Sequence, residues 1–158
     1  MEKEHLYTLS VIWTGNKGEG TSGYKAYGRD HIIQSGSKAE IAGSADPNFR
    51  GSPERYNPEE LFVSSISTCH MLWYLHFCSV NRIVVTDYRD QARGIMVENP
   101  DGSGYFKEVE LNPVITLTQA DMVARAEALH HEAHKFCFIA NSCNFPITHK
   151  PVFKIQPA

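Results

Sequence analysis

Two of the four cysteines are placed where they could act together as thiol nucleophiles. Cys69 falls in the middle of a long apolar stretch, and Cys137 falls near the end of a second, amphipathic one. The reactive form of a cysteine is the thiolate, and a cysteine on an apolar helix face is more often an inert small hydrophobic residue. The neighbours of Cys69 favour the reactive alternative, because small and polar residues let a ligand or another segment approach closely: Ser64, Ser65, Ser67, Thr68 and His70.

The stretch that must position Cys69, residues 57–81, has the features of one long helix. Asn57 is a good N-cap, Pro58 suits the first helical position, and Glu60 follows the cap by three residues, where its carboxylate can accept the cap's N–H. The expected buried stripe comprises Phe62, Ile66, Cys69, Trp73 and Phe77. A helix of about 23 residues is roughly 35 Å long, and one that is apolar on most sides must be enclosed by this chain or by a second copy.

A second helix and several strands complete the predicted fold. Thr118 and Asp121 resemble a capping box that opens a helix running to about Cys137. Its expected buried face comprises Met122, Val123, Ala126, Leu129, Ala133, Phe136 and Cys137. Strands are expected over residues 7–14, 31–34, 38–42, 83–88, 91–98, 105–117 (or two strands interrupted at Pro113) and 152–155. The order βββ-α-βββ-α predicts a single α+β domain over residues 1–158, with antiparallel sheets and a long central helix.

Composition narrows the class of protein. The chain has 158 residues, of which 42% are hydrophobic and 21% are charged, as expected for one globular domain with a core. A net charge of -3 gives no reason to expect a nucleic acid or an anionic membrane as partner. The polar N-terminus lacks a signal core, and the cysteines form no CxxC pair. A cytoplasmic protein with some reactive thiols is therefore expected.

A metal site is a weaker interpretation of the second helix. His130, His134 and Cys137 recur at i, i+4 and i+7 on one face, a spacing that can bind zinc. One helix offers only three such ligands, so solvated or packed histidines are the simpler interpretation and no metal or cofactor is assigned. Trp73 and Phe77 are expected in the core rather than against a substrate.

Several motifs resemble those of the OsmC/Ohr superfamily. Residues 57–62 (NPEELF), followed by Ser67-Thr68-Cys69, are similar to its helix start and to the interval before its reactive cysteine. The end of the second helix, residues 134–137 (HKFC), resembles the place of its second cysteine. Residues 41–51 (IAGSADPNFRG) and 70–75 (HMLWYL) are most similar to the OsmC-like branch.

This resemblance implies an intertwined homodimer that reduces peroxides, organic hydroperoxides especially, and is reset by an external dithiol. Cys69 would be the peroxidatic cysteine, Cys137 the resolving cysteine, and Glu59 the acid that holds a catalytic arginine. That arginine would be Arg29 or, as the alternative, Arg50. The family's second cysteine is usually followed by proline, and a serine lies two residues after the cysteine. Here the residues that follow it are Phe138, Ile139 and Ala140.

Physical chemistry explains why an arginine and a dimer are expected. Cys69 lies beyond the reach of the helix dipole, and burial favours a neutral thiol, so a permanent cation must stabilise the thiolate. Glu59 precedes Cys69 by ten positions, or about 15 Å along one helix. Two copies that pack these helices antiparallel would bring Glu59 of one copy near Cys69 of the other.

Some alternatives stay open at this point. Cys143 is an alternative resolving thiol, and Tyr24 and Tyr27 are candidates to line a pocket for a hydroperoxide tail. Besides the peroxidase, two further functions are considered: a non-catalytic dimer that binds a small molecule, and a metal-holding structural dimer.

Overall fold

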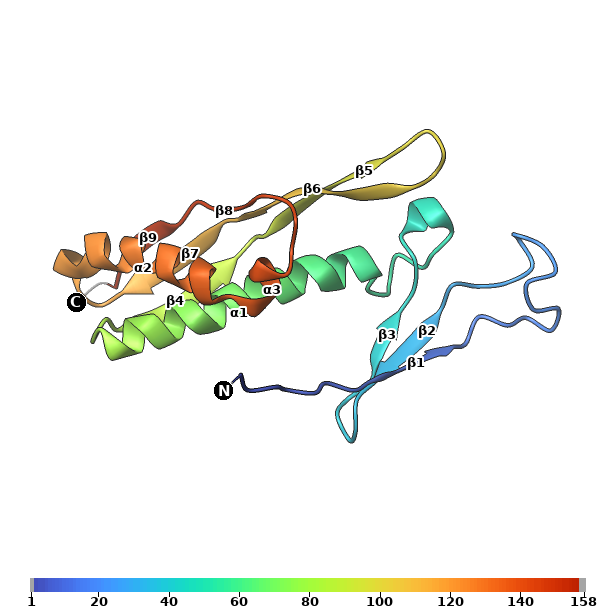
Figure 1. Cartoon of the computed structure of the whole chain (residues 1–158), viewed down its shortest axis with the longest axis horizontal. Coiled ribbons are helices and arrows are strands. Elements are labelled where there is room, and N and C mark those ends of the chain that lie inside the picture. Colours follow the sequence, from blue (N-terminus) through green and yellow to red (C-terminus); the bar gives the residue numbers. More distant parts are fainter. Residues whose placement is uncertain (1, 157–158) are drawn as a thin grey trace. The chain divides into compact units, whose positions relative to one another are not determined.

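A computed structural model describes residues 2–156, which form a mixed α/β structure in two compact units, Met1–Leu61 and Phe62–Ala158 (Figure 1). In chain order the elements are β1 (Ser10–Trp13), β2 (His31–Gln34), β3 (Ile41–Gly43), η1 (Pro47–Phe49), α1 (Pro58–Val80), β4 (Val85–Asp90), β5 (Arg93–Glu98), β6 (Gly104–Leu111), β7 (Pro113–Leu117), η2 (Ala120–Met122), α2 (Val123–Phe136), α3 (Phe138–Asn141), β8 (Ile147–His149) and β9 (Val152–Ile155). The expectation of one domain over residues 1–158 stays a prediction.

The first unit contains a three-stranded antiparallel sheet in the order β1-β2-β3. Its strands are short, and the chain between β1 and β2 is a long glycine-containing loop, as the sequence predicted. A buried hydroxyl organises the segment before α1. Ser44 donates to the Asp30 carboxylate at 2.9 Å and accepts the main-chain N–H of Ser52 at 3.0 Å.

The second unit contains two three-stranded sheets, β4-β7-β9 and β5-β6-β8. The pairs β4–β7 and β5–β6 are antiparallel, but β6–β8 and β7–β9 are parallel. The prediction of purely antiparallel sheets was therefore wrong at these two pairs. The region predicted to be one strand or two is two strands, because the chain turns at Asn112 and Pro113 begins β7. Between the second predicted helix and the strand predicted at 152–155, where no helix or strand was expected, the structure contains α3 and β8.

Helix α1 begins where the sequence predicted. The Asn57 side chain accepts the main-chain N–H of Glu60 at 2.8 Å, and the Glu60 carboxylate accepts that of Asn57 at 3.1 Å. These two bonds form a complete capping box. The buried stripe differs from the prediction, since Cys69, Trp73 and Phe77 are only half-buried. The fully buried residues of α1 are Ile66, His70, Tyr74 and Cys78.

Helix α2 begins later than predicted. Thr118 does not cap it: a 3₁₀ turn, η2, comes first, and the Thr118 N–H that Asp121 would accept in a capping box is bonded to the carbonyl of Val84. Side chains of α1, α2 and β7 form the larger core cluster, which comprises Tyr74, Cys78, Ile83, Ile115, Leu117, Ala126, Leu129 and Ala133. A smaller cluster surrounds Ile66, Val109 and Leu111. Within residues 2–156, no helix is long and apolar enough to cross a membrane.

Candidate functional site

Cys69 lies in the wall of an open groove of about 490 Å³ in the second unit. Helix α1 contributes five lining residues and the segment after α2 contributes two: Ser65, Thr68, Cys69, Leu72, Trp73, Phe138 and Ile139. The half-buried position of Cys69 follows from this groove, because the core side of α1 is occupied by other residues. A thiol in an accessible, mostly apolar groove can meet a small molecule, which a core thiol cannot.

The structure places Cys137 next to Cys69. Cys137 is fully buried and directly follows the last residue of α2. Burial, followed by an interaction with the Cys69 side chain, raises the pKa of the Cys137 thiol to about 12, so Cys137 keeps its proton. Both thiols are free, so the described structure is that of the reduced pair.

Cys137 also holds the short helix that follows it. Its Sγ accepts the main-chain N–H of Ala140 at 3.4 Å and so caps α3. Phe138 and Ile139 of α3 line the groove. The position of two groove residues is thus tied to the sulfur of the second cysteine.

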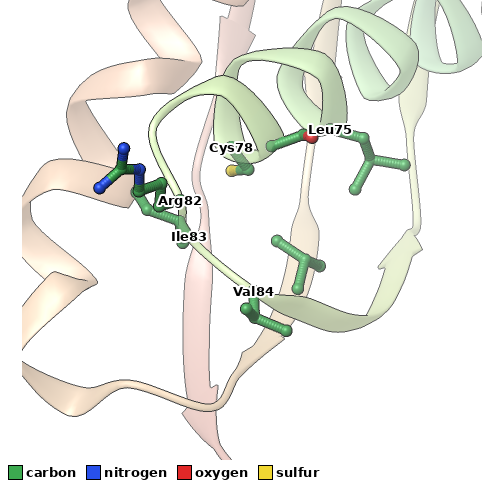
Figure 2. A pocket seen from close by; sticks show the side chains of 7 residues that line it. Leu75, Cys78, Arg82, Ile83 and Val84 are labelled. Atoms are coloured by element: carbon green, nitrogen blue, oxygen red, sulfur yellow. The ribbon is translucent and has the colours of Figure 1, made fainter.

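The other two thiols are placed differently. Cys78 is in the core at the end of α1, beside a second hollow of about 400 Å³; Figure 2 shows it with Arg82, Ile83 and Val84 of the following segment. Burial raises the pKa of Cys78, so this thiol stays neutral. Cys143 is half-buried, its Sγ donates to the carbonyl of Ile139 at 3.2 Å, and burial raises its pKa as well. Neither thiol lines the Cys69 groove.

Arg29, the first candidate for the catalytic arginine, is held by its own loop. Its guanidinium donates to the carbonyls of Tyr27 at 2.6 Å and Tyr24 at 3.0 Å. It also lies over both tyrosine rings, 4.1 Å from the centroid of Tyr27 and 4.5 Å from that of Tyr24. Tyr24 and Tyr27 thus bind the guanidinium, and a role in lining a substrate pocket stays a prediction. The alternative, Arg50, is exposed and lies 5.8 Å from the Tyr24 ring.

Glu59 is half-buried in the first turn of α1, and its carboxylate makes no hydrogen bond or ion pair with another residue between positions 2 and 156. Its predicted pairing with Arg29 is therefore not seen within one chain and stays a prediction for a dimer. Sequence reasoning did not consider Arg55. Its Nε is ion-paired with the Asp30 carboxylate at 3.5 Å, and one of its terminal nitrogens, Nη1, is buried without a hydrogen-bond partner among the described residues.

Buried histidines next to the cysteine pair were not predicted. His70 and His130 are at most 1% exposed, and a hydrogen bond of 2.9 Å joins His70 Nε2 to His130 Nδ1. The rings of Tyr74 and His149 stack on the pair. Across residues 2–156, no three His, Cys, Asp or Glu side chains are arranged to hold a metal ion. His130, His134 and Cys137 therefore form no metal site among the described residues of one chain, and a metal site shared between two copies stays a prediction.

Two groove residues were also missed or misassigned. Trp73, expected in the core, is half-buried and lines the groove. Phe138 was noted only as a departure from the family pattern, yet its side chain is 69% exposed and stands in the same groove. The available signal in the sequence was a phenylalanine directly after the cysteine that ends the second helix.

Comparison with known proteins agrees with this geometry. Residues 51–151 match a family model described as OsmC-like protein. Among solved structures, an OsmC-like protein of unknown function from Vibrio cholerae is 30% identical, with a TM-score of 0.84 over 94% of this chain and 100% of that chain. No curated protein matches the sequence.

More distant structures share the fold. An organic hydroperoxide resistance protein from Elizabethkingia anophelis, solved with a thiocyanate bound, is 20% identical, with a TM-score of 0.68 over 98% of this chain and 100% of that chain. The organic hydroperoxide resistance protein OhrB of Bacillus subtilis is 17% identical, with a TM-score of 0.60 over 95% of this chain and 98% of that chain.

Proposed function

The chain belongs to the OsmC-like family, and we propose that it is a thiol-dependent peroxidase that reduces organic hydroperoxides. The observation that carries the proposal is the Cys69–Cys137 contact at the wall of an open, mostly apolar groove. Structures of the same fold are named organic hydroperoxide resistance proteins, which supports this choice among thiol reactions. We also propose that the enzyme acts in the cytoplasm, where a reducing environment keeps its cysteines available as thiols.

The proposed reaction uses the two thiols in sequence. The Cys69 thiolate attacks the terminal oxygen of ROOH and breaks the O–O bond, and the leaving alkoxide takes up a proton to become ROH. Cys69 is then a sulfenic acid. Cys137 attacks its sulfur, the S–O bond breaks, and water leaves as the disulfide forms. An external dithiol reduces that disulfide and restores both thiols.

The raised pKa of Cys137 fits the resolving role. Burial is its largest cause, followed by the interaction with the Cys69 side chain. A protonated Cys137 does not compete with Cys69 for the peroxide. Its proton leaves as water with the oxygen of the sulfenic acid when the disulfide forms.

We further propose that the active enzyme is an intertwined homodimer in which Glu59 of one copy orients Arg29, or Arg50, beside Cys69 of the other. The carboxylate of Glu59 lacks a partner among residues 2–156, which supports a partner on a second chain. A guanidinium can pair with a carboxylate and stabilise a thiolate at the same time. Sedimentation as a monomer at micromolar concentration would contradict the dimer.

Peroxide consumption tests the proposal. Reduced protein is incubated with cumene hydroperoxide and dithiothreitol, and residual peroxide is followed with time. Wild type is expected to turn over, Cys69→Ser to lose turnover, and Cys143→Ser to keep it. A mass map after one equivalent of peroxide should show the Cys69–Cys137 disulfide; a disulfide between Cys69 and Cys143 would assign the resolving role to Cys143.

The apolar groove also favours a second candidate function, a non-catalytic dimer that binds a small molecule. In that case the wild type would consume no peroxide, and all four thiols would remain titratable after exposure to it. The two outcomes are exclusive, so the same experiment decides between them.

A further inference from the structure

The groove beside Cys69 has an aromatic wall. Phe138 is 69% exposed although it is large and apolar, and its ring meets that of Trp73 edge-on, with 5.7 Å between centroids and 73° between planes. Trp73 is supported from other sides by Phe77 at 5.7 Å and Phe136 at 5.3 Å. The indole is therefore fixed by its packing, and the Phe138 ring leaves most of its own surface uncovered.

The position of Phe138 is also fixed by the backbone. It is the first residue of α3, and the sulfur of Cys137 caps this single turn through the N–H of Ala140. The ring of Phe138 therefore lies next to the cysteine pair, because Phe138 directly follows Cys137. A substrate whose peroxide group meets Cys69 would extend along this ring.

The other described residues that line the groove have no free group that could pair with a charged substrate. The hydroxyl of Ser65 donates to the carbonyl of Phe62 at 2.7 Å, and that of Thr68 donates to the carbonyl of Ser64 at 2.8 Å. Both hydroxyl protons are thus used within α1. Among the described residues that line the groove, none is charged. A charged substrate tail that extends along Phe138 would lose water and gain no partner from these lining residues. The arginine proposed beside Cys69 is already paired with the thiolate and with Glu59, so such a tail is unfavourable.

We propose that Phe138 is a specificity-determining residue, which together with Trp73 selects hydroperoxides that carry an uncharged aromatic ring. The inference rests on the proposed peroxidase function and specifies its substrate. Aromatic rings prefer edge-to-face and offset contacts over simple apolar burial, and a fixed indole with an uncovered phenyl ring offers both. An alkyl group of similar size gains the burial but not the ring contacts.

A comparison of substrates with the same tertiary hydroperoxide tests this proposal. Cumene hydroperoxide, its para-carboxylate derivative and tert-butyl hydroperoxide differ only in the group that would meet Phe138. In Phe138→Leu, which keeps an apolar side chain but removes the ring, kcat/KM for cumene hydroperoxide is expected to fall about three- to tenfold. The value for tert-butyl hydroperoxide is expected to stay within twofold, and wild type is expected to discriminate against the carboxylate.

Tyr105→Leu is the matched control, because it removes a similarly exposed ring (58%) from β6, outside the groove. It should leave all three substrates unchanged. Equal losses for cumene and tert-butyl hydroperoxides in Phe138→Leu would overturn the proposal, as would no loss for either. Melting curves of both variants show whether the fold is retained.

Binding of the product separates this proposal from the peroxidase itself. In isothermal titration calorimetry, cumyl alcohol should bind wild type about three- to tenfold more tightly than Phe138→Leu, whether or not peroxide is consumed. Absence of turnover with this binding difference intact would refute only the proposed function. Equal binding, or none because a second copy of the chain fills the groove, would refute the aromatic selection.

Discussion

Lowering the pH below neutrality should destabilise the fold through the buried His70–His130 pair. Burial, followed by the charge of His149, lowers the pKa of His70 to about 4 from an ordinary value of 6.5. Burial, followed by the charge of His70, lowers the pKa of His130 to about 3. Both rings are therefore neutral in the native protein, and a proton added to either one would place a charge in a closed apolar site beside Tyr74.

The sign of the effect follows from the proton balance. Below pH 6.5 the unfolded chain binds protons at both positions, whereas the folded chain does not until the pH approaches 4 for His70 and 3 for His130. Their contribution to stability is thus complete above pH 6.5 and is lost as the pH falls toward those values. Each pH unit corresponds to about 1.4 kcal/mol per group, so acidification from pH 6.5 to 5 should cost about 2 kcal/mol for each histidine, or about 4 kcal/mol for the pair.

Urea unfolding at pH 7.5, 6.0 and 5.0, at one protein concentration, measures this loss. His130→Gln should reduce the difference between pH 7.5 and pH 5.0 by about 2 kcal/mol, because one of the two titrating rings is gone. His131→Gln is the control, since His131 is the next residue of α2 and is exposed. A pH dependence in His130→Gln as steep as in wild type, or a wild type that gains stability on acidification, would refute the reasoning.

Two further predictions concern helix ends. Asn57→Ala removes the side chain that accepts the N–H of Glu60. The free energy of unfolding measured in urea should therefore fall by about 1 kcal/mol. An unchanged value would show that the capping box does not stabilise the fold. Oxidation with diamide should speed hydrogen exchange at Ala140, because an S–S bond of about 2.05 Å draws the Cys137 sulfur away from the N–H that it caps. Cys137→Ser, which can cap but cannot form the disulfide, should show no change on the same treatment; equal exchange in reduced and oxidised wild type would contradict the coupling.

The parts of the fold that follow from short-range pattern were predictable. The start of α1 depends on residues within four positions of one another, so Asn57 and Glu60 were enough to place it. The same reasoning failed for α2, where the Thr118 N–H is used by Val84, a residue 34 positions earlier in the chain. The parallel pairs made by β8 and β9 were missed for a similar reason, since strands of three and four residues carry little pattern of their own.

The buried face of α1 could not be read from the helix alone. This helix carries apolar residues on all its sides. The sequence pattern therefore predicted the helix, but it did not predict which side packs against the rest of the unit. The stripe through Cys69 and Trp73 is as apolar as the stripe that is buried, yet in the structure it lines the open groove. The motif that contains Cys69 predicted the cysteine pair, but it contained no information on the aromatic wall, because Phe138 reaches the groove only through α3.

The two histidines show why residue type misled the prediction at the site. From the sequence, His70 was one of the polar neighbours of Cys69, and His130 belonged to a zinc-binding spacing or was a solvated or packed histidine. In the structure one hydrogen bond joins the two rings across 60 positions of sequence, and His130 Nε2 is buried without a partner among the described residues. Their hydrogen bond joins the residue after Cys69 on α1 to a residue of α2 that lies two turns before Cys137 and on the same face. A contact that fixes the two helices at this level also fixes the approach of the two sulfurs. We therefore expect the pair that makes the fold sensitive to acid also to hold the two cysteines close, so that acidification separates them as it unfolds the chain.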